Sequence, residues 1–288
     1  MKKFNFEDPA DREEFMDFKE KEPEKAQEII DQERKKAEAY SLLHQYDTIS
    51  LEYAFATVTD PNKRFVQYPE SIRLLGDLDG KIVFDIGCAN GTFTKMIKSA
   101  GASEVVGFEP SENELEKARS AEKESPQGIK YVASYLEIPF DKKFDVVSAI
   151  MVIPAVNQEQ MEEIFNKASD LLVDGGKFVA LTLNHDFKRF GEIVNNRKFS
   201  KRVDGKIDID FYNEKGEVYM SIIDTDFSQE EVEKALKESG FGEIKWESLK
   251  VASAGIEELG TEFWDKYEED CPYIGLVAYK NKIQDLIN

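Results

Sequence analysis

Short apolar runs alternate with amphipathic segments over most of the chain from residue 81 onward. The runs have the length, and the flanking glycine and polar residues, that are typical of buried strands. They predict strands at residues 81–86, 104–108, 129–133, 144–150 and 177–183. Helices are expected between them, at residues 92–99, 111–122 and 158–172. Strands that alternate with helices predict a parallel sheet with helices on both faces, which is an α/β fold.

This alternation is interrupted after the fifth of these strands. Residues 207–212 and 217–223 read as two strands joined by a turn, so we expect a β-hairpin inserted at about residues 184–227. The hairpin is expected to cover the edge of the sheet that faces a ligand. One helix and two last strands complete the pattern, at residues 228–239, 244–251 and 274–279.

The first 45 residues differ from the rest because they are acidic, densely charged and poor in β-branched residues. Residues 11–43 carry a thin apolar stripe at helical spacing, which Pro23 is expected to split into two helices. The expected organisation is a helical extension at residues 1–45 and one domain at residues 46–288. The sequence leaves open whether the extension packs on that domain, closes over a site as a lid, forms the arm of a homodimer or stays unpacked.

The composition is that of a globular protein with a strong negative charge. Hydrophobic residues make up 41% of the 288 residues, and the net charge is −20. A field of that sign repels phosphate backbones and anionic lipids, so neither nucleic acid nor a membrane is expected as a partner. No apolar run approaches the ~18 residues that span a bilayer. Cys88 and Cys271 are too few for a disulfide framework, which favours a cytoplasmic location.

A glycine-rich turn, Asp85-Ile86-Gly87-Cys88-Ala89-Asn90-Gly91, joins the first strand to the first helix. Open α/β sheets bind ligands at the carboxyl ends of their strands, where this turn lies. Its Gly-x-x-x-Gly spacing lacks both the dinucleotide fingerprint and the P-loop lysine, which disfavours an NAD-type oxidoreductase. Glu109 ends the second strand, roughly where an acid that accepts from the hydroxyls of a ribose is expected, ~20 residues on.

At this point the chain resembles the class I S-adenosylmethionine (SAM)-dependent methyltransferases. The resemblance implies a Rossmann-like, mostly parallel seven-stranded sheet with SAM as cofactor and S-adenosylhomocysteine (SAH) as product. A weaker similarity, in residues 46–54 and 260–276, is to small-molecule methyltransferases of the toxoflavin-synthase type. The segments that match the family are residues 83–91, 107–111, 144–149 and 171–178.

The family resemblance also implies roles for individual residues. Tyr46 and Tyr53 would close over the cofactor, Asp85 would order the glycine turn, and Glu109 would hold the ribose. This sequence departs from the family after the third strand, where an acid that accepts from the adenine amino group is usual and Ser134 stands in its region. The remaining residues expected to border the cofactor are Gly87, Cys88, Asn90, Gly91, Pro110, Tyr135, Leu136, Ile150 and Met151.

Methyl transfer from a sulfonium mainly requires positioning, and a base helps when the nucleophile carries a proton. His185 follows the fifth strand on the ligand side, so it is the candidate base or substrate contact, with Tyr53 as a second catalytic candidate; His44 is the weaker histidine. No spacing of metal ligands is visible, so no metal is expected. Aromatic residues in and before the hairpin either wall a flat substrate or form its buried face, namely Phe187, Phe190, Phe211, Tyr212 and Tyr219.

The function expected from the sequence is SAM-dependent methylation of an N or O atom of a small organic molecule. Three alternatives stay open: a catalytically silent SAM-binding protein, a methyltransferase acting on a protein partner, and, more weakly, the oxidoreductase. The acceptor molecule cannot be named from the sequence.

Overall fold

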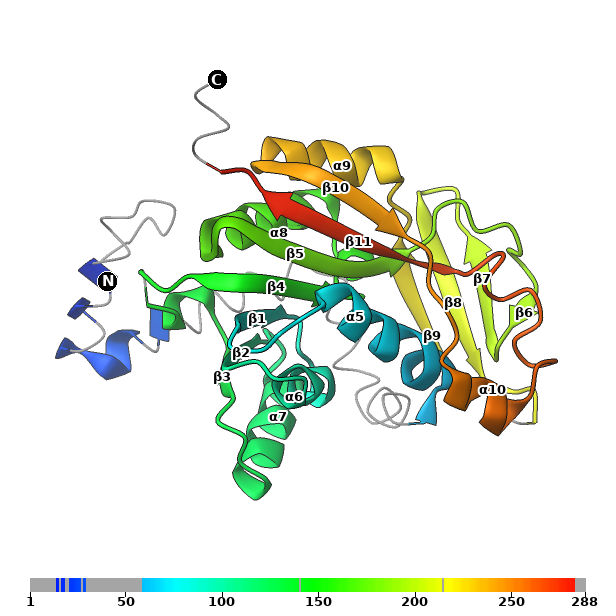
Figure 1. Cartoon of the computed structure of the whole chain (residues 1–288), viewed down its shortest axis with the longest axis horizontal. Coiled ribbons are helices and arrows are strands. Elements are labelled where there is room, and N and C mark those ends of the chain that lie inside the picture. The colour runs from blue at the N-terminus through cyan, green and yellow to red at the C-terminus, as the bar shows by residue number, and fades with distance from the viewer. Residues whose placement is uncertain are drawn as a thin grey trace.

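The computed structural model describes residues 14–15, 17–18, 21–26, 28–29, 59–139, 141–213 and 215–282. A seven-stranded sheet runs through the molecule in the order β10-β11-β5-β4-β1-β2-β3 (Figure 1). The expected mostly parallel sheet is confirmed, because only β11 pairs antiparallel, with β5 on one side and β10 on the other. The strands are β1 (Ile82–Ile86), β2 (Glu104–Phe108), β3 (Lys130–Val132), β4 (Phe144–Ile150), β5 (Leu172–Leu183), β10 (Phe241–Glu247) and β11 (Tyr273–Lys280).

Helices cover both faces of this sheet. Apolar side chains of α5, α6 and α7 join the core on one face, and those of α8 and α9 join the core on the other. Central strands such as β4 are therefore buried from both sides, which explains their apolar sequences. The helices are α5 (Tyr68–Leu75), α6 (Thr92–Ser99), α7 (Glu112–Glu124), α8 (Gln158–Leu171), α9 (Gln229–Glu238) and α10 (Ser253–Leu259).

The strand order reverses next to β1, which has β2 on one side and β4 on the other. The chain leaves β1 toward one face and leaves β4 toward the other, so a crevice opens at the carboxyl ends of these two strands. The glycine turn after β1 and the short 3₁₀ helix η3 (Ile153–Ala155) after β4 border this crevice. The order of the strands therefore places the candidate site at the carboxyl ends of β1 and β4.

The insertion forms a four-stranded sheet, β6 (Ile193–Val194), β7 (Arg197–Lys201), β8 (Lys206–Tyr212) and β9 (Val218–Thr225), which we call the cover sheet. The expected hairpin is confirmed as β8 and β9, and two further strands that were not expected, β6 and β7, extend it. Strand β7 reads Arg-Lys-Phe-Ser-Lys, so charged residues hide its pattern. The cover sheet lies beside the carboxyl ends of β4 and β5 (Figure 1), and Thr225 Oγ1 donates to the carbonyl of Val156 at 2.8 Å.

A buried ionic cluster connects the cover sheet to the segment before β1 that contains Asp60. Arg197 on β7 donates to the carboxylate of Asp60 and to the hydroxyl of Tyr273, and all three side chains are buried. Asn62 joins the cluster by donating from its backbone N–H to Asp60 Oδ1 at 3.0 Å, and its own Oδ1 accepts from the hydroxyl of Tyr267 at 2.6 Å. Because an unpaired charge at this depth is costly, the cluster specifies the position of the cover sheet.

Several boundaries differ from those expected. The turn expected at residues 175–176 lies within β5, as an irregularity between the pairs Phe144–Leu172 and Val146–Lys177. The last two strands begin before their expected positions, and α5 and α10 were not expected. No helix in the described ranges has both the length and the apolar composition to cross a bilayer.

The described residues of the N-terminal extension are helical on both sides of Glu22, as the position of Pro23 predicts. Phe15, Ala26 and Ile29 are buried together, with Phe18 and Leu136 packed against them. Leu136 belongs to a short 3₁₀ helix after β3, η2 (Tyr135–Glu137), so these residues of the extension pack on the domain. The expected boundary at residues 45–46 lies outside the described residues.

Candidate functional site

The glycine turn between β1 and α6 has a backbone that only glycine tolerates at two positions. Gly87 and Gly91 have φ values of 66° and 79°. A Cβ on Gly87 would lie 2.5 Å from Val152 Cγ2, and one on Gly91 would lie 2.4 Å from Tyr131 Oη. The turn therefore leaves main chain exposed where a side chain would otherwise stand.

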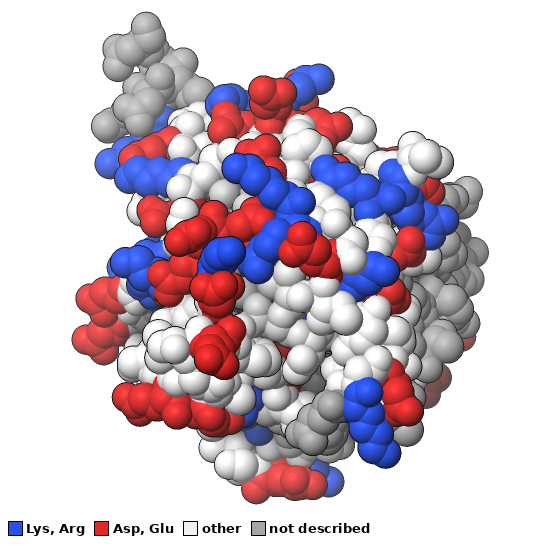
Figure 2. Space-filling model, turned by 90° about the vertical axis from the view of Figure 1, so that its right-hand side faces the viewer, with Lys and Arg blue, Asp and Glu red and all other residues white. Residues whose placement is uncertain are grey.

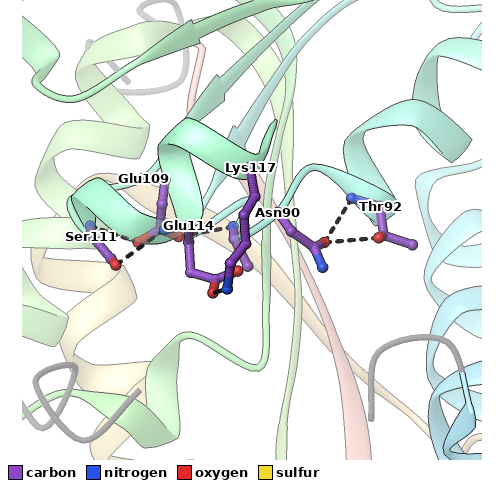
Figure 3. Close-up of polar contacts among 7 residues, drawn as sticks. Asn90, Thr92, Glu109, Ser111, Glu114 and Lys117 are labelled. Atoms are coloured by element: carbon purple, nitrogen blue, oxygen red, sulfur yellow. Dashed lines mark hydrogen bonds and ion pairs between the residues drawn. The ribbon is translucent and has the colours of Figure 1, made fainter. Parts of the chain in front are cut away.

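Glu109 is held directly against this turn. Its carboxylate accepts from the backbone N–H of Ala89 at 2.8 Å and from that of Ser111 at 2.9 Å (Figure 3). Both donors are backbone groups, so the carboxylate is fixed in place, and Glu109 is buried. A carboxylate has about four acceptor positions, so a ligand hydroxyl can still bind there.

Asp85 ties three elements together beneath the turn. It accepts from Thr94 Oγ1 on α6 at 2.7 Å and from Ser148 Oγ on β4, also at 2.7 Å. Burial raises the pKa of Asp85 to about 6, against the two hydroxyl hydrogen bonds, which lower it. Both oxygens are engaged within the protein, so the position suits the expected role of ordering the turn.

The raised pKa of Asp85 predicts a pH dependence of stability. A carboxyl whose folded pKa is raised stabilises the fold most below its unfolded pKa of 3.8, and that contribution is lost as pH rises through about 6. The unfolding free energy of the wild type, relative to that of Asp85→Asn, should therefore fall by about 2 kcal/mol between pH 4 and pH 7. Urea unfolding at both pH values measures this difference, and a constant difference would contradict it.

Two pockets lie on either side of the glycine turn and meet at it. The residues common to both are Gly87, Ala89, Ile150 and Met151. The first, which we call the polar pocket, encloses about 450 Å³, its open mouth included, and is also lined by Lys63, Gln67, Tyr68, Asp85, Cys88, Asn90, Thr92 and Phe93. The second, the apolar pocket, encloses about 700 Å³ and is also lined by Ile86, Phe108, Glu109, Pro110, Glu114, Tyr135, Val152, Ala155, Val156 and Ile164.

The two linings suit the two halves of a nucleoside joined to an amino acid. Aromatic and aliphatic side chains of the apolar pocket can sandwich a flat heterocycle, and Phe108 stacks on Tyr135 there with ring centroids 4.3 Å apart. Glu109 stands where a sugar hydroxyl can donate. The polar pocket offers side-chain and backbone groups to a charged amino-acid end.

Most residues expected to bind the cofactor border one of these pockets. Burial also raises the pKa of the Cys88 thiol, which keeps it protonated and agrees with a packing role. Tyr46 and Tyr53, like His44, lie outside the described residues. The residues that line the pockets as expected are Asp85, Gly87, Cys88, Asn90, Glu109, Pro110, Tyr135, Ile150 and Met151.

Three residues expected at the cofactor line neither pocket. Gly91 packs against the ring of Tyr131. Ser134 uses its hydroxyl as a helix cap, accepting from the backbone N–H of Leu136 at 3.2 Å. Leu136 itself packs on the N-terminal extension. The acid that the family has near Ser134 therefore has no side-chain replacement at Ser134 itself.

His185 lies where the chain enters the cover sheet, and it lines neither pocket. Its Nδ1 is 3.0 Å from Asp226 Oδ1, at the point where the chain leaves the cover sheet, and Lys201 Nζ is 3.1 Å from the other oxygen of Asp226. The His185 side chain is 40% exposed, so it remains accessible. Of the insertion's aromatic residues, Phe187 and Phe211 are buried in the core of the cover sheet, and none of them lines either pocket.

The sequence did not indicate the pocket residues that precede β1 in the chain. Lys63 and Gln67 belong to a short π-helix, η1 (Lys63–Gln67), and Tyr68 begins α5. Tyr68 stacks on Phe93 of α6 with centroids 5.6 Å apart, which closes one side of the polar pocket. A π-helical turn often marks a functional site, but its hydrogen bonding leaves no pattern in the sequence.

Comparison with known proteins agrees with this geometry. The family described as "Methyltransferase domain" matches residues 83–176. An uncharacterised methyltransferase of Staphylococcus carnosus is 25% identical over 152 residues, which cover 50% of this chain and 71% of that protein. A ubiquinone biosynthesis O-methyltransferase of Agrobacterium fabrum is 28% identical over 148 residues, covering 51% of this chain and 56% of that protein. The match thus spans about half of the length of this O-methyltransferase.

Solved structures show the same fold. A SAM-dependent methyltransferase from Mesorhizobium loti is 22% identical and has a TM-score of 0.54, covering 77% of this chain and 99% of that one. A protein from Pyrococcus horikoshii is 20% identical with a TM-score of 0.55, covering 81% and 99%. Residues 83–176 are therefore similar to a methyltransferase domain, and the chain has the fold of these SAM-dependent methyltransferases.

Proposed function

We propose that this protein transfers the methyl group of SAM to an N or O atom of a small organic molecule. The observation that carries the proposal is the pair of pockets that meet at Gly87, Ala89, Ile150 and Met151, with the cover sheet beside them. The O-methyltransferase relatives support an oxygen acceptor. Similarity to the toxoflavin-synthase type suggests a flat nitrogen heterocycle as the other class to test.

The residues present fit the cofactor. SAM supplies an activated methyl group on its sulfonium, while the protein has to hold and align the two reactants. Glu109 would accept from ribose hydroxyls, and Phe108, Pro110 and Tyr135 would line the adenine. Asn90 and Gln67 would face the amino-acid end in the polar pocket. Orientation of this kind supplies ~7–11 kcal/mol of the barrier in well-aligned reactions.

The surface over the cover sheet suits an uncharged or mixed acceptor. Lys and Arg side chains lie among Asp and Glu side chains on the face seen in Figure 2, although the whole chain has a net charge of −20. Within the cover sheet and its turn, Lys201, Arg202 and Lys206 are close in sequence to Asp204 and Asp208, and Arg202 forms an ion pair with Asp208. The proposal includes a cytoplasmic location, which agrees with two cysteines that are both buried and free.

His185 is the proposed base for an acceptor that carries a proton at neutral pH. Its contact with Asp226 through Nδ1 orients the ring and leaves Nε2 available. We expect His185→Gln to lower kcat about 100-fold with a phenol or catechol acceptor while SAH affinity stays within two-fold. Single-turnover rates and calorimetry measure the two quantities. Unchanged turnover would instead show that the contact between His185 and Asp226 only holds together the two ends of the cover sheet.

The test of the proposed function uses the full chain with SAM and a panel of catechols, phenols, amines and nitrogen heterocycles. Formation of SAH, with a matching mass increase of one methyl group on an acceptor, is expected for at least one class. A Glu109→Ala variant serves as the control for background hydrolysis. Tight SAH binding with no turnover on any acceptor would favour a silent binding protein. Turnover only with a polypeptide would favour a protein acceptor.

A further inference from the structure

A second acidic side chain, Glu114, borders the apolar pocket beside Glu109. It lies in the first turn of α7, is 2% exposed and lines the pocket. Its Oε1 accepts from Lys117 Nζ at 2.5 Å. Its Oε2 is covered and has no hydrogen-bond partner within the described part of the chain. One half of this carboxylate is thus satisfied and the other half is not.

A covered carboxylate oxygen without a donor is unfavourable, because burial removes its water and nothing replaces it. Buried polar atoms in native proteins have partners in the great majority of cases. An apolar side chain at this position would avoid the cost. The carboxylate therefore points to a donor that reaches Oε2 when the pocket is filled.

We propose that Oε2 of Glu114 accepts a hydrogen bond from a ribose hydroxyl of the bound cofactor, so that Glu109 and Glu114 hold the sugar together. Figure 3 shows the Glu114 side chain between those of Glu109 and Asn90, and Glu109 and Glu114 both line the apolar pocket. The adenine would lie against Phe108, Tyr135 and Val152, which form the apolar part of the lining. The inference rests on the proposed function only through the identity of the cofactor.

The experiment is calorimetric titration of SAH into the full chain and three variants. Glu114→Met removes the acceptor at similar length and should weaken SAH binding about ten-fold. Glu114→Gln keeps an amide oxygen as acceptor and should stay within about three-fold of the wild type. Glu116→Met, on the exposed side of α7, is the matched control and should bind SAH as the wild type does.

Deoxy analogues of SAH identify the group that donates. For either the 2′-deoxy or the 3′-deoxy analogue, the difference in affinity between the wild type and Glu114→Met should disappear. A difference that persists with both analogues would overturn the proposal, and so would equal SAH affinity of the two proteins. A lower melting temperature of unliganded Glu114→Met with unchanged SAH affinity would show a purely structural role and would also overturn it.

These readouts separate the inference from the proposed function. Affinities that follow the expected order, with no turnover of any acceptor, would leave the role of Glu114 intact and remove the proposed reaction. A wild type that binds neither SAM nor SAH would overturn both.

Discussion

Exchange of Glu109 for glutamine should weaken SAH binding at least 100-fold, nearly as much as exchange for alanine. Both oxygens of Glu109 face backbone donors, the N–H groups of Ala89 and Ser111. A glutamine amide has one oxygen and one NH₂ group, so either orientation sets one donor against another. Hydrogen bonds to a charged group contribute ~1.5–3 kcal/mol each, so the exchange reverses one of these bonds and weakens the other, in addition to changing the ribose contact.

Calorimetry with SAH measures this loss. Glu116→Gln, which changes the net charge of the chain by the same amount, provides the control. That residue is exposed on α7, so its exchange alters net charge equally without touching the turn. Should Glu109→Gln bind SAH within ten-fold of the wild type, the backbone contacts of Glu109 would not matter for the site. The ribose assignment would then need another acceptor.

Exchange of Gly87 for alanine should both destabilise the fold and abolish measurable SAH binding. The added Cβ would meet Val152 Cγ2 at 2.5 Å, and the φ of 66° is unfavourable for alanine. Strain of this backbone conformation costs about 1–2 kcal/mol, and overpacking against a stiff valine costs about 1–3 kcal/mol more. Because Gly87 and Val152 both line the apolar pocket, the relief of the clash also changes the pocket's shape.

Gly80→Ala separates the two contributions. Gly80 has a φ of 70° but nothing within 4 Å of an added Cβ, so only the backbone strain remains. Chemical denaturation should show a loss of about 1 kcal/mol for Gly80→Ala and about 3 kcal/mol for Gly87→Ala. SAH affinity should be unchanged in the former. Equal losses of stability in both variants would show that the contact with Val152 relaxes without cost.

Much of this site could be predicted from the sequence, because its main features depend on local backbone geometry. Glycine spacing after an apolar strand, and an acid at the end of the next strand, depend on residues close together in sequence. Their meeting follows from the rule that parallel strands align their carboxyl ends. Asp85, Gly87 and Glu109 were therefore predictable, and the structure places all three at one pocket edge or the other.

The missed features depend on contacts between distant segments. Lys63 and Gln67 reach the polar pocket from a π-helix, and Glu114 reaches the apolar pocket from a helix whose polar positions all look solvated in the sequence. The sequence did not predict strand β7 of the cover sheet, because its Arg197 is buried by contacts with the distant residues Asp60 and Tyr273. In the sequence that arginine argues against a buried strand.

The amino-acid order by itself determined the alternation of strands and helices, the parallel sheet, the glycine turn and its acid, since each arises from backbone geometry and apolar periodicity over a few residues. Tertiary structure alone decided which polar side chains become buried and against what: Ser134 as a cap, His185 against Asp226, Glu114 beside the pocket. Burial of a polar group depends on partners far along the chain, and no local pattern encodes them.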